Sequence, residues 1–139
     1  MPIYWTPKLA TGVTRIDEEH QELFDRVNKL VAALGAAKAN SEVAPLIGFL
    51  RDYVGSHFGG EATLMRLHRY PEAAEHLAQH QFFVAEFEGL VKEFDKVGAT
   101  GLVTIKLNKL LCDWLRDHVA STDKKLGGFL QAKGAAATA

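Results

Sequence analysis

The sequence predicts an all-α protein, an antiparallel up-down-up-down four-helix bundle. Apolar side chains recur at spacings of three and four along four separate stretches, which is the period of an amphipathic helix. Only short stretches separate these segments, and we find neither an alternating strand pattern nor an internal repeat. Because short connections place consecutive helices side by side, an antiparallel bundle is the natural architecture.

The chain begins with an extended arm, expected over residues 1–16, which shows no periodic pattern. We expect Trp5, Val13 and Ile16 to hold this arm against the bundle. The first helix follows, with acidic residues 17–19 in its first turn, where the positive end of the helix dipole favours them. Its apolar stripe includes one histidine and consists of Ile16, His20, Leu23, Phe24, Val27, Leu30, Val31 and Leu34.

The second helix is expected to begin near Ser41, and Pro45 is tolerated in its first turn. Its stripe places a histidine and a glutamate among leucine and valine: Val43, Ile47, Leu50, Val54, His57, Glu61, Leu64 and His68. Gly55, Gly59 and Gly60 also lie in this helix, each at a cost of roughly 1 kcal/mol relative to alanine. We expect close approach of a neighbouring helix or of a metal site to compensate for them.

Tyr70-Pro71 separates the second helix from the third, because the residue before a proline is pushed away from helical angles. The third stripe is headed by two histidines: His76, His80, Phe83, Phe87, Leu90, Phe94 and Val97. The fourth consists of Val103, Leu107, Leu110, Leu111, Trp114, Leu115 and His118. We expect residues 127–130 to form a short C-terminal cap and residues 131–139 a flexible tail.

Length and composition indicate a single domain over residues 1–139, with the bundle and cap at about 17–130. The chain is 47% hydrophobic and 24% charged with a net charge of −1, so no basic surplus points to nucleic acid. A single cysteine, Cys112, excludes an internal disulfide. We find neither a secretory signal nor an apolar run near the ~20 residues of a membrane span, so a cytoplasmic protein is expected.

The four stripes deliver seven metal-capable side chains to positions where leucine or valine would be expected. These are His20, His57, Glu61, His76, His80, His118 and Asp123. Taken singly, each has an ordinary alternative: an isolated pair of histidines four residues apart is often solvated, and Glu61 could pair with Arg66. Seven ionisable groups in one core are different, because each costs several kcal/mol when it is buried without a partner. Metal coordination satisfies all seven together.

His118 and Asp123 are five residues apart, which leaves them roughly 140° out of phase on a regular helix. For both to face one site, the helix must end or bulge between them. Residues 119–122 are the expected place, since π-bulges often occur at functional sites.

The ligand set favours a pair of ions over a single ion. Seven ligands are too many for one ion with an open position, and two carboxylates can bridge two ions ~3.5–4 Å apart. Imidazole suits iron, copper, zinc and nickel. The Glu-x-x-His pairs of ferritin-like di-iron enzymes and the His-Glu-x-x-His of zinc proteases are both absent. A histidine-rich pair of irons remains.

These motifs resemble the hemerythrin family of di-iron oxygen-binding proteins, in its single-domain bacterial form. The resemblance runs from Trp5 to about Leu130 and depends on the full set of spacings. It includes Gly12-Val13, Ile16-Asp17 with His20, His57-Phe58 with Glu61, Met65, Tyr70-Pro71, His76 with His80, and Trp114-Leu115 with His118 and Asp123. Myohemerythrin, a relative, is itself a standard example of a four-helix bundle.

The resemblance implies roles for these residues. His76, His80 and His118 would hold one iron, and His20 and His57 the other. Glu61 and Asp123, with an oxo or hydroxo bridge, would link both ions, which are Fe²⁺ in the deoxy form and Fe³⁺ in the oxy and met forms. The iron with two histidines keeps an open position for O2. His68 matches no ligand position. We expect it to interact favourably with the negative, C-terminal end of the dipole of its helix.

The function expected from this resemblance is reversible O2 binding for transport, storage or delivery, with no catalytic residue. Apolar residues near the ligands would form a dry O2 pocket, which favours binding over catalysis: Leu23, Phe24, Trp114 and Leu115. The alternatives are a peroxidase, oxidase or nitric-oxide-handling enzyme on the same scaffold, or an O2 sensor. Because the chain carries no second domain, a sensor would need a partner protein, and a carrier would need a protein that accepts O2.

Overall fold

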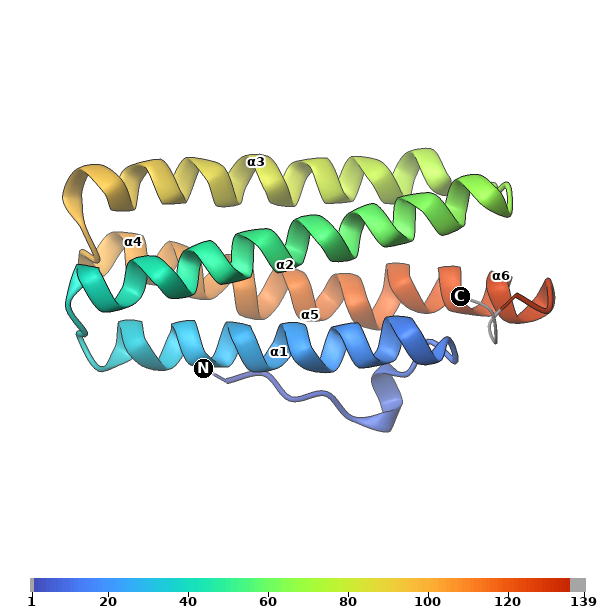
Figure 1. The fold of residues 1–139 in the computed structure, drawn as a ribbon, viewed down its shortest axis with the longest axis horizontal. Coiled ribbons are helices and arrows are strands. Elements are labelled where there is room, and N and C mark those ends of the chain that lie inside the picture. The colour runs from blue at the N-terminus through green and yellow to red at the C-terminus, as the bar shows by residue number, and fades with distance from the viewer. Residues whose placement is uncertain (1, 136–139) are drawn as a thin grey trace.

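The computed structural model describes residues 2–135, which form an antiparallel four-helix bundle (Figure 1), and so confirms the predicted fold class. The first three rods are α1 (Thr14–Gly35), α2 (Asn40–Leu67) and α3 (Ala73–Val97). Five elements follow one another without a break to form the fourth rod: α4 (Gly101–Asn108), η2 (Lys109–Trp114), α5 (Leu115–His118), η3 (Val119–Asp123) and α6 (Lys124–Ala132). None of the helices in residues 2–135 combines the length and apolar character that a bilayer crossing requires.

The fourth rod extends beyond the length that the sequence predicts. Residues 127–130, expected as a separate cap, belong to α6. The helix continues because its inner face stays apolar there, and Leu126 and Leu130 are fully buried. Of the expected flexible tail, residues 131–132 are still helical and Ala135 is buried, whereas residues 136–139 lie outside the described part of the chain.

The N-terminal arm runs along the outside of α1 and ends at Val13, three residues earlier than expected (Figure 1). A short 3-10 turn, η1 (Pro7–Leu9), interrupts it. Asn28 fixes the arm through its side-chain amide, which accepts from the backbone N–H of Ile3 at 2.8 Å and donates to the Ile3 carbonyl at 2.7 Å. Buried Ile3 anchors the arm more deeply than Trp5, which is only partly buried.

The glycines of α2 do not mark a close approach. A Cβ on Gly55 or Gly59 would meet no other atom within 4 Å, and one on Gly60 would only touch the Arg15 guanidinium at 3.7 Å. The expected compensation by a neighbouring helix or a metal site is therefore wrong for Gly55 and Gly59. Gly127 of α6, in contrast, does permit a close approach, because a Cβ there would collide with the backbone of Thr11.

Two apolar clusters fill the bundle, and the seven predicted ligands separate them along the helices. The larger cluster contains residues such as Leu23, Phe58 and Phe83. The smaller one lies nearer the α2–α3 turn and contains Ile16, Leu64, Met65, Tyr70, Leu126 and Leu130. On α1, for example, Ile16 precedes His20 and Leu23 follows it. The polar residues thus occupy a layer inside an otherwise apolar core.

Candidate metal centre

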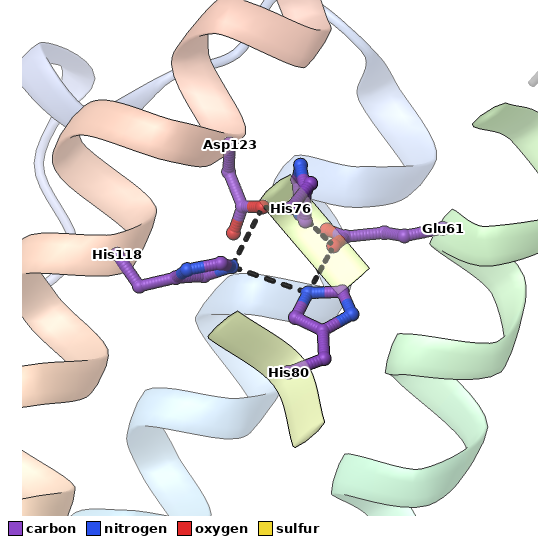
Figure 2. Close-up of side chains that lie close together, drawn as sticks. All are labelled: Glu61, His76, His80, His118 and Asp123. Atoms are coloured by element: carbon purple, nitrogen blue, oxygen red, sulfur yellow. Dashed lines mark hydrogen bonds and ion pairs between the residues drawn. The ribbon is translucent and has the colours of Figure 1, made fainter. Parts of the chain in front are cut away.

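All seven predicted side chains converge inside the bundle, and each is at most 5% exposed. His20 comes from α1, and the other six come from the three remaining rods. Figure 2 shows five of them pointing toward one another: Glu61, His76, His80, His118 and Asp123. Removing this many ionisable groups from water costs several kcal/mol each unless something compensates their charges and lone pairs.

Helical spacing orients the ligands of α2 and α3. His57 and Glu61 are four residues apart on α2, so they share one face, and His57 Nε2 lies 3.1 Å from Glu61 Oε2. On α3 the rings of His76 and His80 pack edge to face with their centroids 4.6 Å apart. Each pair thus projects into the same layer of the bundle.

A π-helical segment aligns the two ligands of the fourth rod. Residues Val119–Asp123 form η3, in the place where the sequence requires a bulge. In a π-helix the hydrogen bond spans five residues, so His118 and Asp123 come into line. His118 Nε2 accordingly lies 3.2 Å from Asp123 Oδ1. A second π-helical segment, η2, precedes α5, and the apolar stripe gives no sign of it.

The candidate ligand atoms fall into two groups that share both carboxylates. One group comprises Glu61, His76, His80, His118 and Asp123, and the other His20, His57, Glu61 and Asp123. Within each group, one nitrogen or oxygen atom per side chain lies within 4.8 Å of all the others. Carboxylates shared between two sets of imidazoles are the arrangement that two bridged ions require.

The two carboxyl groups are ionised despite their burial. Burial acts to raise the pKa of Glu61, but the charge of His57 and the hydrogen bonds of His20 and His57 hold it well below its usual range. Burial and the charge of Glu61 both act to raise the pKa of Asp123, yet its contacts with His118 and His20 lower it. The layer therefore carries two buried negative charges.

The histidines respond to these charges in different ways. Burial acts to lower the pKa of His57, but the charge of Glu61 and the hydrogen bonds to Glu19 and Glu61 together outweigh it and raise this pKa to about 10. The pKa of His76 rises to about 9 because its contacts with Asp123 and Glu61 likewise outweigh burial. The pKa of His80, by contrast, is lowered, chiefly by burial. Without a metal, protons on histidine must supply the positive charge that the carboxylates attract.

The arrangement of donors and acceptors also fits a metal. His57 Nδ1 lies 2.9 Å from Glu19 Oε1, an acceptor, so in the neutral imidazole that a metal binds, Nδ1 carries the hydrogen and Nε2 has a lone pair. Nε2 lies 3.1 Å from Glu61 Oε2, so either a proton or a cation must lie between these two atoms. Of the eight buried side-chain polar atoms in residues 2–135 that lack a hydrogen-bond partner, six belong to the seven predicted ligands. A cation between these atoms would satisfy those that face one another.

Sequence reasoning missed two residues that contact the histidines from outside. Glu19 is the partner of His57 Nδ1, and Gln79 Oε1 accepts from His118 Nδ1 at 2.8 Å. Each lies at the edge of an apolar stripe, directly before a buried histidine in the sequence. That position is the only sequence signal for either residue, because their partners are 38 and 39 residues away.

The four predicted pocket residues occupy different environments. Leu23, Phe24 and Leu115 are at most 2% exposed and belong to the larger apolar cluster. Trp114 is only partly buried; its ring stacks on His118, with centroids 4.8 Å apart and planes 9° apart. Phe58, which the sequence did not single out, stacks in the same way on His80 at 3.8 Å. That O2 occupies the space near Leu23, Phe24, Trp114 and Leu115 stays a prediction.

Comparison with known proteins gives a consistent result. Residues 11–130 match the family described as the Hemerythrin HHE cation binding domain. Bacteriohemerythrin of Methylococcus capsulatus is 35% identical over 131 residues, which cover 92% of this chain and 96% of that protein. A hemerythrin-like protein of Naegleria gruberi is 29% identical over 129 residues, which cover 93% and 94%. A crystal structure of wild-type hemerythrin superimposes with a TM-score of 0.81 at 32% identity and covers 94% of this chain and 98% of its own.

Proposed function

The chain belongs to the hemerythrin family, and on that premise we propose that it binds O2 reversibly at a non-heme di-iron centre. The observation that carries the proposal is the pair of ligand groups that share Glu61 and Asp123. His76, His80 and His118 would hold one iron and His20 and His57 the other, with an oxo or hydroxo bridge between them. A pair of ferrous ions held there would supply the two electrons that O2 takes up on binding and returns on release.

The residues around the ligands support binding without further chemistry. Leu23, Phe24 and Leu115 are buried in the apolar cluster next to the ligand layer. Such surroundings keep water and protons away from bound O2, and both promote its irreversible reduction. We therefore propose a carrier for transport, storage or delivery, which passes O2 to a protein that accepts it.

A second candidate function is a di-iron peroxidase, oxidase or nitric-oxide-handling enzyme, and one feature favours it. A small polar hollow beside His76 is lined by Tyr70, Glu72, Glu75, Gln79, Thr122 and Lys125. Such a hollow could lead protons from solvent toward the ligand layer, which an enzyme needs and a carrier avoids. Turnover of peroxide or nitric oxide well above that of free iron would support this candidate.

The deciding experiment is to count the metal ions per purified chain and follow the visible spectrum through reduction, exposure to O2 and removal of O2. Two irons per chain, with a colour that appears and disappears reversibly, are the expected result. Two irons that become irreversibly ferric at first contact with air would favour the enzyme or a sensor. Zinc, or no bound metal, would overturn the proposal altogether.

A further inference from the structure

In each group of candidate ligands, the Nδ1 atom of one histidine contacts a side chain that is not itself a candidate ligand, and this partner differs between the two groups. His57, in the two-histidine group, contacts the carboxylate of Glu19 at 2.9 Å. His118, in the three-histidine group, donates to the amide oxygen of Gln79 at 2.8 Å. The Nδ1 atoms of the other three ligand histidines have no hydrogen-bond partner in residues 2–135. The two groups are therefore distinguished by one charged partner and one neutral partner.

Neighbouring residues hold both partners in place. The Glu19 carboxylate lies 3.5 Å from the Arg15 guanidinium, one turn earlier on α1. The Tyr53 hydroxyl donates to the Glu19 carbonyl at 3.1 Å, which ties α2 to this part of α1.

Gln79 is fixed in a similar way by η3. Its amide oxygen accepts both from His118 Nδ1 and from the Thr122 hydroxyl, each at 2.8 Å. His118 must then carry its hydrogen on Nδ1, which leaves Nε2 free to bind a metal. Glu19 has the same effect on His57.

We propose that Glu19 and Gln79 are positioning residues that make the two iron positions electronically unequal. A carboxylate that accepts a hydrogen bond from a histidine ligand pulls on the Nδ1 proton of that ring. The ring then becomes a stronger electron donor to the metal, which favours the higher oxidation state of the metal. A neutral amide fixes the ring without adding charge. An iron held by the two-histidine group would then be the one more easily oxidised. This inference rests on the proposed di-iron function.

The test exchanges charge at each partner and leaves the hydrogen bond in place. Glu19→Gln removes the charge, so we expect a higher reduction potential of the iron centre and about tenfold weaker O2 binding. Gln79→Glu adds a charge beside His118, so we expect a shift of the reduction potential in the opposite direction. Glu18→Gln and Gln81→Glu are matched controls. They change the charge in the same way at exposed residues that lie close in sequence to Glu19 and Gln79.

A second measurement covers the case in which a variant binds O2 poorly for unrelated reasons. Glu19→Ala and Gln79→Ala lose the hydrogen bond, and each should lower iron affinity roughly 10- to 100-fold in competition with a chelator. Glu18→Ala and Gln81→Ala should leave iron affinity unchanged. If Glu19→Gln shifts the reduction potential no more than Glu18→Gln does, the inference is overturned.

These results separate the inference from the proposed function. Reversible O2 binding with no difference between Glu19→Gln and its control would leave the function standing and overturn the unequal irons. Irreversible oxidation of the unmodified protein, together with opposite shifts of the reduction potential in Glu19→Gln and Gln79→Glu, would overturn the proposed function and leave the unequal irons standing.

Discussion

The six histidines of the chain have two kinds of surroundings. Five are at most 5% exposed and meet inside the bundle, whereas His68 lies at the C-terminal cap of α2 and is half-buried. On α2 alone, His57 faces the ligand layer inside the bundle, whereas His68 caps the end of the helix. The side chain alone does not decide the role of a histidine; its position on the helix does.

This difference gives a test at a single residue. His76→Ala removes a ligand and should lower the iron content below two per chain, measured by metal analysis of the purified protein. His68→Ala makes the same change outside the ligand layer and should retain two irons. Its loss of stability should stay within the roughly 0.3–1 kcal/mol of a helix-end charge. Equal iron loss in both variants would contradict the assignment of His76 as a ligand.

Leu115 offers a second test, because it is 1% exposed and lies three residues before His118. Leu115→Ala should leave two irons bound but speed autoxidation, since a cavity beside the ligands admits water. Leu107→Ala is the matched control: Leu107 is equally buried on the same rod, about 12 Å farther along the axis. Both variants should lose about 2–5 kcal/mol of stability. Lifetimes of the oxy form that do not differ between them would remove Leu115 from the proposed O2 pocket.

At the scale of elements, helix α2 contains glycines that lower its helix propensity. Gly55 and Gly59 are exposed, and no neighbouring atom lies within 4 Å of the place that a Cβ would occupy on either of them. Gly55→Ala and Gly59→Ala should therefore each raise the free energy of unfolding by about 1 kcal/mol, measured by urea denaturation. Gly127→Ala should destabilise the protein, because its Cβ would collide with the carbonyl of Thr11. Destabilisation by all three substitutions would mean that the α2 glycines have a role in packing.

The fourth rod shows how an irregular element makes the site possible. A regular α-helix would turn Asp123 away from His118, and η3 brings the two within 3.2 Å. The sequence indicates this irregularity because two candidate ligands five residues apart require it. It gives no such indication for η2, where the buried residues Leu111 and Cys112 are apolar and no pair of ligands fixes the phase.

At the scale of the whole molecule, the charged layer lies between two apolar clusters and couples stability to pH. In the metal-free protein the pKa values of His57 and His76 are raised to about 10 and about 9, above the ordinary 6.5. Protonated histidine then stabilises the fold fully below pH 6.5, and this contribution is lost as the pH rises through 9 to 10. The free energy of unfolding of the metal-free protein should therefore fall over this range.

Iron should reverse the trend, because a metal binds only the deprotonated nitrogens. Iron affinity should rise over the same pH range, and the iron-loaded protein should become increasingly more stable than the metal-free one. Urea denaturation of both forms at several pH values measures this difference. A metal-free protein whose stability does not change between pH 6.5 and 10 would contradict the role given to His57 and His76.

Local periodicity in the sequence was enough to predict the four helices and six of the seven ligand candidates, because residues three and four apart share a helix face wherever that helix lies. Asp123 is out of phase with this pattern. The sequence also required the bulge before Asp123, since helix phase is a property of spacing along the chain. The contacts of Glu19 and Gln79 with histidines on other helices could be seen only in the folded chain, as could the close approach at Gly127 and its absence at Gly55 and Gly59. Those contacts join residues far apart in sequence, and the distance between two helices is set by how they pack, which no period within either helix records.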